Sequence, residues 1–193
     1  YIILMAIGAF LMRGAGCTWN DITDQKIDAR VARTKSRPIP SGQITPKQAL
    51  KWMLIQTLAG ALVLFTFNKF TIVLGIFALV PVAIYPFAKR FTWWPQLFLG
   101  VAFNWGALIG WSAQIGSLSL SPILLYLAGI SWTLFYDTIY AHQDKEDDAL
   151  IGVRSTARLF HSNTKKWLWC FLILSISLMI GAFVVALQNN VNV

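Results

Sequence analysis

The chain has 193 residues, of which 56% are hydrophobic and 12% are charged, and its mean hydropathy is +0.59. This composition departs from that of soluble domains toward that of membrane proteins. The net charge of +8 would suit a nucleic-acid partner, but basic residues of membrane proteins collect in loops on one side of the bilayer for topological reasons. We therefore expect a protein of the lipid bilayer and no nucleic-acid partner.

Apolar stretches of about the ~20 residues that an α-helix needs to cross a bilayer recur along the chain. They cover residues 1–17, 48–68, 70–88, 95–115, 121–141 and 165–187. We predict an all-α, polytopic bundle of transmembrane helices that forms a single domain over residues 1–193. Because the chain begins at Tyr1 inside an apolar run, without an initiator Met or a basic flank, we expect it to be part of a longer protein.

All eight acidic residues fall into two short segments. The segment NDITDQKID contains Asp21, Asp24 and Asp28, and the segment YDTIYAHQDKEDD contains Asp137, Asp144, Glu146, Asp147 and Asp148. Because a charge close to hydrocarbon is costly, ionisable residues grouped in this way indicate a functional site. Ordinary solvated loops are the alternative, but such loops rarely hold every acid in a chain.

Successive loops of a membrane bundle alternate between its two sides. Fourteen of the sixteen Lys and Arg residues lie in or beside the loops 18–47, 89–94 and 142–166, which are alternate loops. The two acidic segments belong to the same loops. We therefore expect acidic and basic groups to meet at one mouth of the bundle. This mouth would face the cytoplasm in a bacterial inner membrane or the matrix in a mitochondrial inner membrane.

The spacing within both acidic segments fits helices. Asn20, Asp24 and Asp28 recur every four residues and would lie on one face if the first span continues as a helix. Asp144 and Asp148 are also four residues apart. Clusters that offer only oxygen ligands, without His or Cys, suit Mg²⁺ or Mn²⁺.

Asp137 precedes Asp144 by seven residues, which would place it on nearly the same helical stripe. Basic residues follow the first acidic segment in the run DARVARTKSRPIPSG. A diphosphate needs both metal bridges and direct cationic donors, and a hydrophobic bundle would dissolve an isoprenoid tail. The pattern indicates metal-assisted ionisation of an allylic diphosphate.

Four motifs occur in an order that resembles the UbiA superfamily of intramembrane prenyltransferases. They are NDxxDxxxD from Asn20, RTxxRPIPSG from Arg33, YPxxKR from Tyr85, and YDTxY from Tyr136 leading into DxxxDxxxGxxS. The sequence YDTIYAHQDKEDD and the GVRSTA that follows resemble most closely the branch that prenylates 4-hydroxybenzoate in ubiquinone biosynthesis. The resemblance covers essentially the whole chain. It implies a bundle around a central cavity, truncated here at both ends.

The resemblance also implies roles for individual side chains. Mg²⁺ would be the cofactor, with Asn20, Asp24, Asp28, Asp144 and Asp148 as its ligands. The diphosphate of polyprenyl diphosphate would be contacted by Arg33, Arg37 and Lys89, with Asp21 in support and Tyr140 in the same substrate site. The catalytic set would comprise Asp24, Asp144 and Asp137. We hypothesise that Asp137 orients or deprotonates the acceptor and that Arg90 pairs with its carboxylate.

The expected activity is Mg²⁺-dependent transfer of a polyprenyl group from its diphosphate to the ring carbon ortho to the hydroxyl of 4-hydroxybenzoate. Another aromatic or quinone-precursor acceptor is the alternative within the family. A divalent-cation transporter is the alternative from another class, but acids at only one face of the membrane and the RTxxRP run argue against it. A non-catalytic scaffold explains neither the spacing nor the shared face.

Overall fold

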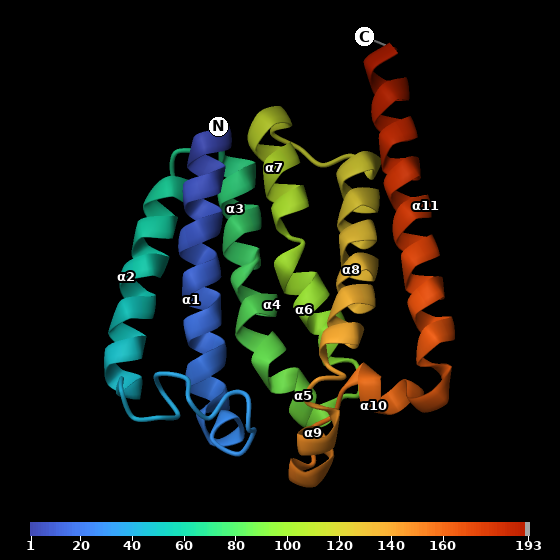
Figure 1. Cartoon of the computed structure of the whole chain (residues 1–193). Helices are drawn as coiled ribbons and strands as arrows, with labels where there is room; N and C mark the ends of the chain where they lie inside the picture. Colours follow the sequence, from blue (N-terminus) through green and yellow to red (C-terminus); the bar gives the residue numbers. More distant parts are fainter. Residues whose placement is uncertain (192–193) are drawn as a thin grey trace.

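The computed structural model describes residues 1–191, with side chains described through residue 188, and over this range the chain forms helices and no strand. Figure 1 shows the long helices side by side as one bundle, with both termini at the same end. Four helical stretches are long and apolar enough to cross a membrane: Ile2–Asp28, Lys69–Phe91, Leu120–Tyr140 and Thr156–Gln188. The protein is therefore an integral membrane protein, and the division into six spans stays a prediction.

The first two helices form an antiparallel pair. Helix α1 (Ile2–Asp28) continues without a break through the first acidic segment, in which no Pro or Gly interrupts the helix. Helix α2 (Pro46–Leu64) begins with a capping box, because the Thr45 side chain accepts from the Gln48 backbone N–H while the Gln48 side chain accepts from the Thr45 N–H. Pro46 at the first helical position fits the same start. The pair thus returns the chain to the end at which it began.

The next rod is continuous in direction but broken in its helical hydrogen bonding. It consists of α3 (Lys69–Phe77), α4 (Leu79–Ile84), the 3₁₀ turn η1 (Tyr85–Phe87) and α5 (Ala88–Phe91). Pro81 and Pro86 lack the N–H that would bond to the carbonyl four residues back. The break between α3 and α4 lies three residues before Pro81, and the break between α4 and η1 lies one residue before Pro86. The rod therefore delivers Lys89 and Arg90 on a short terminal helix, α5.

The central helices pack closely because small residues lie where they cross. Helix α6 (Pro95–Phe103) and helix α7 (Gly106–Ile115) together form one rod that is interrupted at Asn104 and Trp105. Its Gly100 lies against α8 (Leu120–Tyr140), and a Cβ there would be only 3.2 Å from Ile130 Cα. The Asn104 side chain donates to Thr133 Oγ1 across the same contact (2.9 Å).

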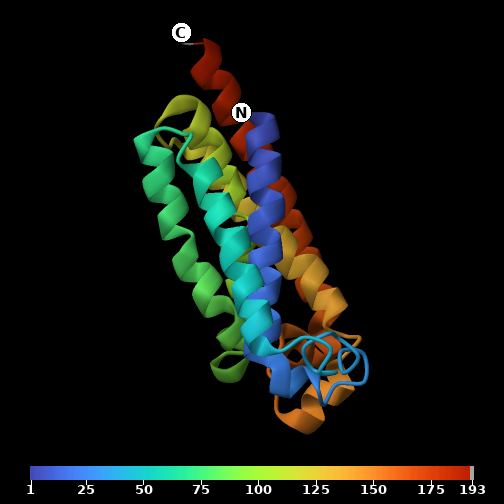
Figure 2. The same cartoon turned by 90° about the vertical axis from the view of Figure 1, so that its left-hand side faces the viewer.

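The chain ends in three short elements and one long helix. These are α9 (Lys145–Ile151), α10 (Thr156–Phe160), the 3₁₀ turn η2 (His161–Asn163) and α11 (Thr164–Val191), which packs along α8. An aromatic cluster of Trp94, Phe160, Trp167 and Phe171 joins α10 and α11 to the start of α6. In Figures 1 and 2 the loop after α1, α5, α9 and α10 all lie at one end of the bundle. The charged loops therefore share one face, as loop alternation predicts.

Candidate active site

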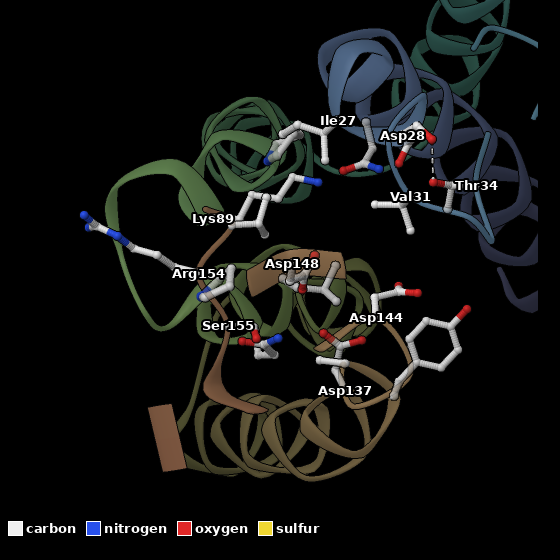
Figure 3. Close-up of a pocket in the computed structure, with 18 of the residues that line it drawn as sticks. Ile27, Asp28, Val31, Thr34, Lys89, Asp137, Asp144, Asp148, Arg154 and Ser155 are labelled. Atoms are coloured by element: carbon white, nitrogen blue, oxygen red, sulfur yellow. Dashed lines mark hydrogen bonds between the residues drawn. The ribbon is translucent and has the colours of Figure 1, made fainter. Parts of the chain in front are cut away.

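A cavity of about 250 Å³ lies at the charged end of the bundle. Its walls come from the end of α1 and the following loop, from α5 and the start of α6, and from the end of α8 through Ser155. The expected site residues in its lining are Asn20, Asp28, Arg33, Arg37, Lys89, Asp137, Tyr140, Asp144 and Asp148. Figure 3 shows Lys89 and Asp28 on one side of this space and Asp137 and Asp144 on the other. The fold thus brings both acidic segments together.

Asp24 lies behind this lining and not in it. Its side chain is completely buried, Lys89 Nζ lies 2.5 Å from Asp24 Oδ2, and Arg90 Nη2 lies 3.6 Å from Oδ1. Neither carboxylate oxygen accepts a hydrogen bond of normal geometry from a described residue. A buried carboxylate in this position depends on the two cations for its charge, so Asp24 ties α5 to α1.

Arg37 folds the loop after α1 back onto the end of that helix. Its Nη1 donates to Asp21 Oδ1 (3.0 Å) and to Asp28 Oδ2 (3.1 Å). The Thr34 hydroxyl donates to the backbone oxygen of Asp28 (2.9 Å), which fixes the loop at a second point. Arg37 is therefore held at the cavity by the acids of the first segment.

Arg33 connects the same loop to the second acidic segment. Its Nε and Nη2 donate to the two oxygens of Asp144 (3.0 and 2.5 Å), and its Nη1 donates to the Tyr140 hydroxyl (3.0 Å). The backbone N–H of Ala32 donates to Asp147 Oδ2 (3.2 Å). The hydrogen bonding of Arg33 to Asp144 raises the pKa of Arg33, as expected for a bidentate charge-assisted contact.

The second acidic segment is bent, and the expectation of one continuous stripe was wrong. Helix α8 ends at Tyr140, turn residues 141–144 follow, and Asp144 is the residue that precedes α9. Asp137 therefore lies on α8, while Asp148 lies one turn after Asp144, with its N–H bonded to the Asp144 oxygen (2.8 Å). Burial, and next the Asp144 carboxylate, raise the pKa of Asp148 to about 6.

The cations and carboxylates of the site neutralise one another. Lys89 pairs with Asp24, Arg37 with Asp28 and Arg33 with Asp144. Arg90 lies outside the lining of the cavity, with a side chain that is 45% exposed and a guanidinium that donates to the Thr23 oxygen (2.6 Å). The structure therefore brings the predicted metal ligands and the predicted substrate contacts together around the cavity, except for Arg90, Asp21 and Asp24, which are not in its lining.

The oxygen-rich lining fits a Mg²⁺ ion that is bound together with a phosphate. Among the residues that the structure describes, no three Asp, Glu, His or Cys side chains converge as a ready metal cage. Mg²⁺ usually takes one or two carboxylates and completes its shell with water and substrate phosphates. Asp28, Asp144 and Asp148, together with the Asn20 amide, line the cavity. This donor set suits an ion that arrives with a phosphate ligand.

Two residues of the cavity received no role in the sequence analysis, although Ser155 is the last residue of the DxxxDxxxGxxS motif. Gln96 and Ser155 line it, and both are almost fully buried. Gln96 follows Pro95, at which the helix begins, and is the first polar side chain of the span 95–115. That position, six residues after Arg90 of the YPxxKR motif, is the signal that could have identified it.

Comparison with known proteins places this site in context. The family model described as "UbiA prenyltransferase family" matches residues 1–193. The protein of Arabidopsis thaliana named "4-hydroxybenzoate polyprenyltransferase, mitochondrial" is 55% identical over 172 residues, which cover 89% of this chain and 42% of that protein. The Dictyostelium discoideum protein of the same name is 51% identical over 191 residues, or 98% of this chain and 41% of that protein. The chain thus spans less than half the length of these relatives.

Two solved structures share the fold. The apo structure of a UbiA homolog from Aeropyrum pernix K1 matches with a TM-score of 0.77 and 25% identity, over 97% of this chain and 70% of that one. A UbiA homolog from Archaeoglobus fulgidus, solved with GPP and Mg²⁺, matches with a TM-score of 0.75 and 19% identity, over 95% of this chain and 66% of that one. The helical arrangement described above is therefore shared with these membrane proteins.

Proposed function

Because the chain belongs to the UbiA prenyltransferase family, we propose that it transfers a polyprenyl group from polyprenyl diphosphate to the ring carbon ortho to the hydroxyl of 4-hydroxybenzoate. The observation that carries the proposal is the meeting of both acidic segments with Arg33, Arg37 and Lys89 around one cavity at the charged end of the bundle. The names of the relatives that are 50–55% identical support the choice of acceptor.

In this proposal the carboxylates that line the cavity hold Mg²⁺ together with the diphosphate. Asn20, Asp28, Asp144 and Asp148 are the ligands in the lining, and Asp24 supports them from behind. Bound Mg²⁺ would supply positive charge that stabilises the departing diphosphate. If Asp144 and Asp28 bind the metal, Arg33 and Arg37 would be free to donate hydrogen bonds to diphosphate oxygens. Lys89 would donate through the N–H groups that Asp24 does not use.

The reaction breaks the carbon–oxygen bond between the prenyl group and its diphosphate and forms a carbon–carbon bond to the aromatic ring. The proton that the ring carbon loses needs an acceptor. Asp137 lines the cavity, and in this proposal it receives that proton or orients the phenol. Val31, Leu99 and Val153 add apolar surface to the same lining, which helps to keep water away from the prenyl carbocation.

The membrane and its side are part of the proposal. The relatives named above are mitochondrial, so a mitochondrial inner membrane with the site on the matrix side is favoured over a bacterial inner membrane with the site on the cytoplasmic side. Polyprenyl diphosphate would reach the site from the bilayer, and 4-hydroxybenzoate from the aqueous side. A protease-protection assay on intact mitoplasts would show which side carries the loop 29–45.

The direct test of function uses membranes that contain the chain, incubated with labelled prenyl diphosphate, 4-hydroxybenzoate and Mg²⁺. We expect a prenylated 4-hydroxybenzoate, and we expect the product to disappear when EDTA removes the metal and to return when Mg²⁺ is added back. A labelled product formed only with a different aromatic acceptor would overturn the choice of substrate. Metal uptake into vesicles without any diphosphate would instead favour a divalent-cation transporter.

A further inference from the structure

Gln96, in the first turn of α6, is a buried amide on the wall of the cavity, and its donor end is unused. The residue is 5% exposed and belongs to the lining. Its Oε1 accepts a hydrogen bond from the backbone N–H of Thr156 (3.2 Å). Its Nε2 makes no hydrogen bond to any other residue that the structure describes. Two N–H groups are therefore available to a ligand.

The orientation of this amide follows from the chemistry of its partner. A backbone N–H can only donate, so the amide atom that faces Thr156 must be the oxygen. Thr156 is itself fully buried, and its Oγ1 lies 2.7 Å from Thr138 Oγ1 on α8. Turning the amide over would leave a buried donor without an acceptor. The Nε2 of Gln96 is therefore directed away from Thr156.

Ser155 offers a second unused donor beside the first. It is 3% exposed, it lines the cavity, and its Oγ accepts from the backbone N–H of Arg158 (3.4 Å). Its hydroxyl proton has no acceptor among the described residues. Gln96 Nε2 is not among the fully buried side-chain atoms that lack a partner, so this atom is reached from the cavity. A ligand in the cavity can therefore supply the acceptors that both donors lack among the described residues.

These donors lie beside Lys89, on the part of the lining formed by α5, the start of α6 and the segment 153–155. Two acids lie close by, because the backbone N–H of Val153 donates to the Asp148 oxygen (2.9 Å) and Figure 3 shows Ser155 near both Asp137 and Asp148. Arg154 shares this part of the lining, but its guanidinium donates to the Phe91 oxygen (2.7 Å) and points away from the other labelled side chains in Figure 3. Lys89 and the positive end of the α6 helix dipole favour an anion at these donors.

We propose that Gln96 and Ser155 donate hydrogen bonds to oxygens of the diphosphate of the prenyl substrate, beside Lys89. The inference rests on the proposed function for the identity of that substrate. Lys89 is paired with Asp24, but its ammonium group has three N–H donors and can contact an anion in the cavity while it keeps this ion pair. Gln96 and Ser155 would add neutral donors beside it.

The decisive variant is Gln96→Glu, because it separates binding from structure. Glu keeps an oxygen that can accept from Thr156 and so retains any purely structural role, but it replaces the two donors by a negative charge. We expect the Kd of geranyl diphosphate with Mg²⁺, measured by calorimetry on the purified full chain, to rise at least about tenfold. The KM for prenyl diphosphate should rise in parallel, while the KM for 4-hydroxybenzoate stays unchanged.

The matched control is Gln143→Glu, which adds the same charge in the exposed turn between α8 and α9, outside the lining. Its affinity for geranyl diphosphate should equal that of the wild type. Ser155→Ala tests the second donor independently, and it remains informative if the Gln96 variant does not fold. We expect this variant to lose affinity for geranyl diphosphate several-fold. Wild-type affinity in Gln96→Glu or in Ser155→Ala, or a raised KM for the acceptor alone, would overturn the proposal.

The experiment also separates this proposal from the proposed function. If the wild type binds geranyl diphosphate and the Gln96→Glu variant does not, the role of Gln96 as a donor is supported. This holds even if the wild type prenylates no aromatic acid. In that case only the proposed transfer to 4-hydroxybenzoate would fail. A wild-type chain that binds no geranyl diphosphate would overturn both.

Discussion

Asp144 and Asp147 lie in the same acidic segment but differ in what they contact. Asp144 accepts two hydrogen bonds from the Arg33 guanidinium and lines the cavity. Asp147 lies outside the lining and, among the described residues, accepts a hydrogen bond from the backbone N–H of Ala32 alone. The sequence analysis separates them only by spacing, because Asp144 belongs to the DxxxD motif and Asp147 does not. Their different surroundings therefore make them a matched pair for mutation.

We expect Asp144→Asn to lower the rate of prenyl transfer at least about 100-fold, because even outer-shell partners of a metal site are worth 10–100-fold. The change removes a predicted metal ligand and leaves Arg33 without its charged partner. Asp147→Asn keeps an oxygen that can accept from Ala32 and should stay within about threefold of the wild type. Initial rates at saturating Mg²⁺ measure both, and equal losses in the two variants would contradict the assignment.

Asp137 allows a second comparison at the scale of single residues. If this carboxylate orients or deprotonates the acceptor, Asp137→Asn should reduce turnover by about 10²–10⁴-fold while the affinity for geranyl diphosphate stays that of the wild type. Asp144→Asn should weaken both. Unchanged turnover in Asp137→Asn, with Asp24→Asn inactive, would remove the acceptor role of Asp137.

At the scale of elements, the contact between α6 and α8 holds Gln96 on the first helix and Asp137 on the second at one cavity. Gly100 is a point of close approach, where a Cβ would lie 3.2 Å from Ile130 Cα and 3.3 Å from its backbone oxygen. Backbone atoms cannot rotate away as the end of a side chain can. The helices must therefore move apart if this glycine gains a side chain.

We expect Gly100→Ala to lower the thermal unfolding temperature in detergent, since overpacking costs roughly 1–3 kcal/mol and exceeds the gain in helix propensity. Gly106→Ala is the control, because no atom lies within 4 Å of the Cβ that it would add. That variant should be neutral or slightly stabilising. Circular dichroism at 222 nm follows both transitions, and equal unfolding temperatures would argue against a close α6–α8 contact.

A second contact between elements joins α10 to α8. The hydroxyls of Thr138 and Thr156 are 2.7 Å apart and fully buried. Replacing Thr138 by Val keeps the shape but leaves the Thr156 hydroxyl without this partner, which should destabilise the fold by about 1–3 kcal/mol. Thr57→Val is the control, because the Thr57 hydroxyl bonds only to the Met53 oxygen of its own helix. Denaturation in detergent should show a smaller change for the control.

At the scale of the whole molecule, the charged loops define one face of the bundle (Figure 1). After Cys17 and Cys170, which are exposed, are replaced by Ser, single cysteines in place of Lys35, Glu146 or Ser117 can report on the two faces. We expect a membrane-impermeant maleimide to label the first two from one side of sealed vesicles and the third only from the other. Labelling of the first two from opposite sides would contradict a shared mouth.

Several features of this protein follow from local properties of the chain. The lengths of the apolar runs set the class of fold, and the alternation of loops puts both acidic segments at one mouth, because each span reverses the side of the membrane. Asn20, Asp24 and Asp28, which are spaced four residues apart, lie on one continuous helix, α1, as predicted. The motifs were sufficient to identify the family, which the family model confirms.

Other features depend on how distant segments pack, and the tertiary structure alone decided them. The partner of Arg33 is Asp144, more than 100 positions away in the chain, and Asp24 is sealed behind Lys89. The break between α8 and α9 separates Asp137 from Asp144. Gln96 becomes a candidate ligand only when Thr156 holds its oxygen. Helical period and hydropathy are local properties of the sequence, whereas ion pairing and burial depend on which helices meet in the folded protein.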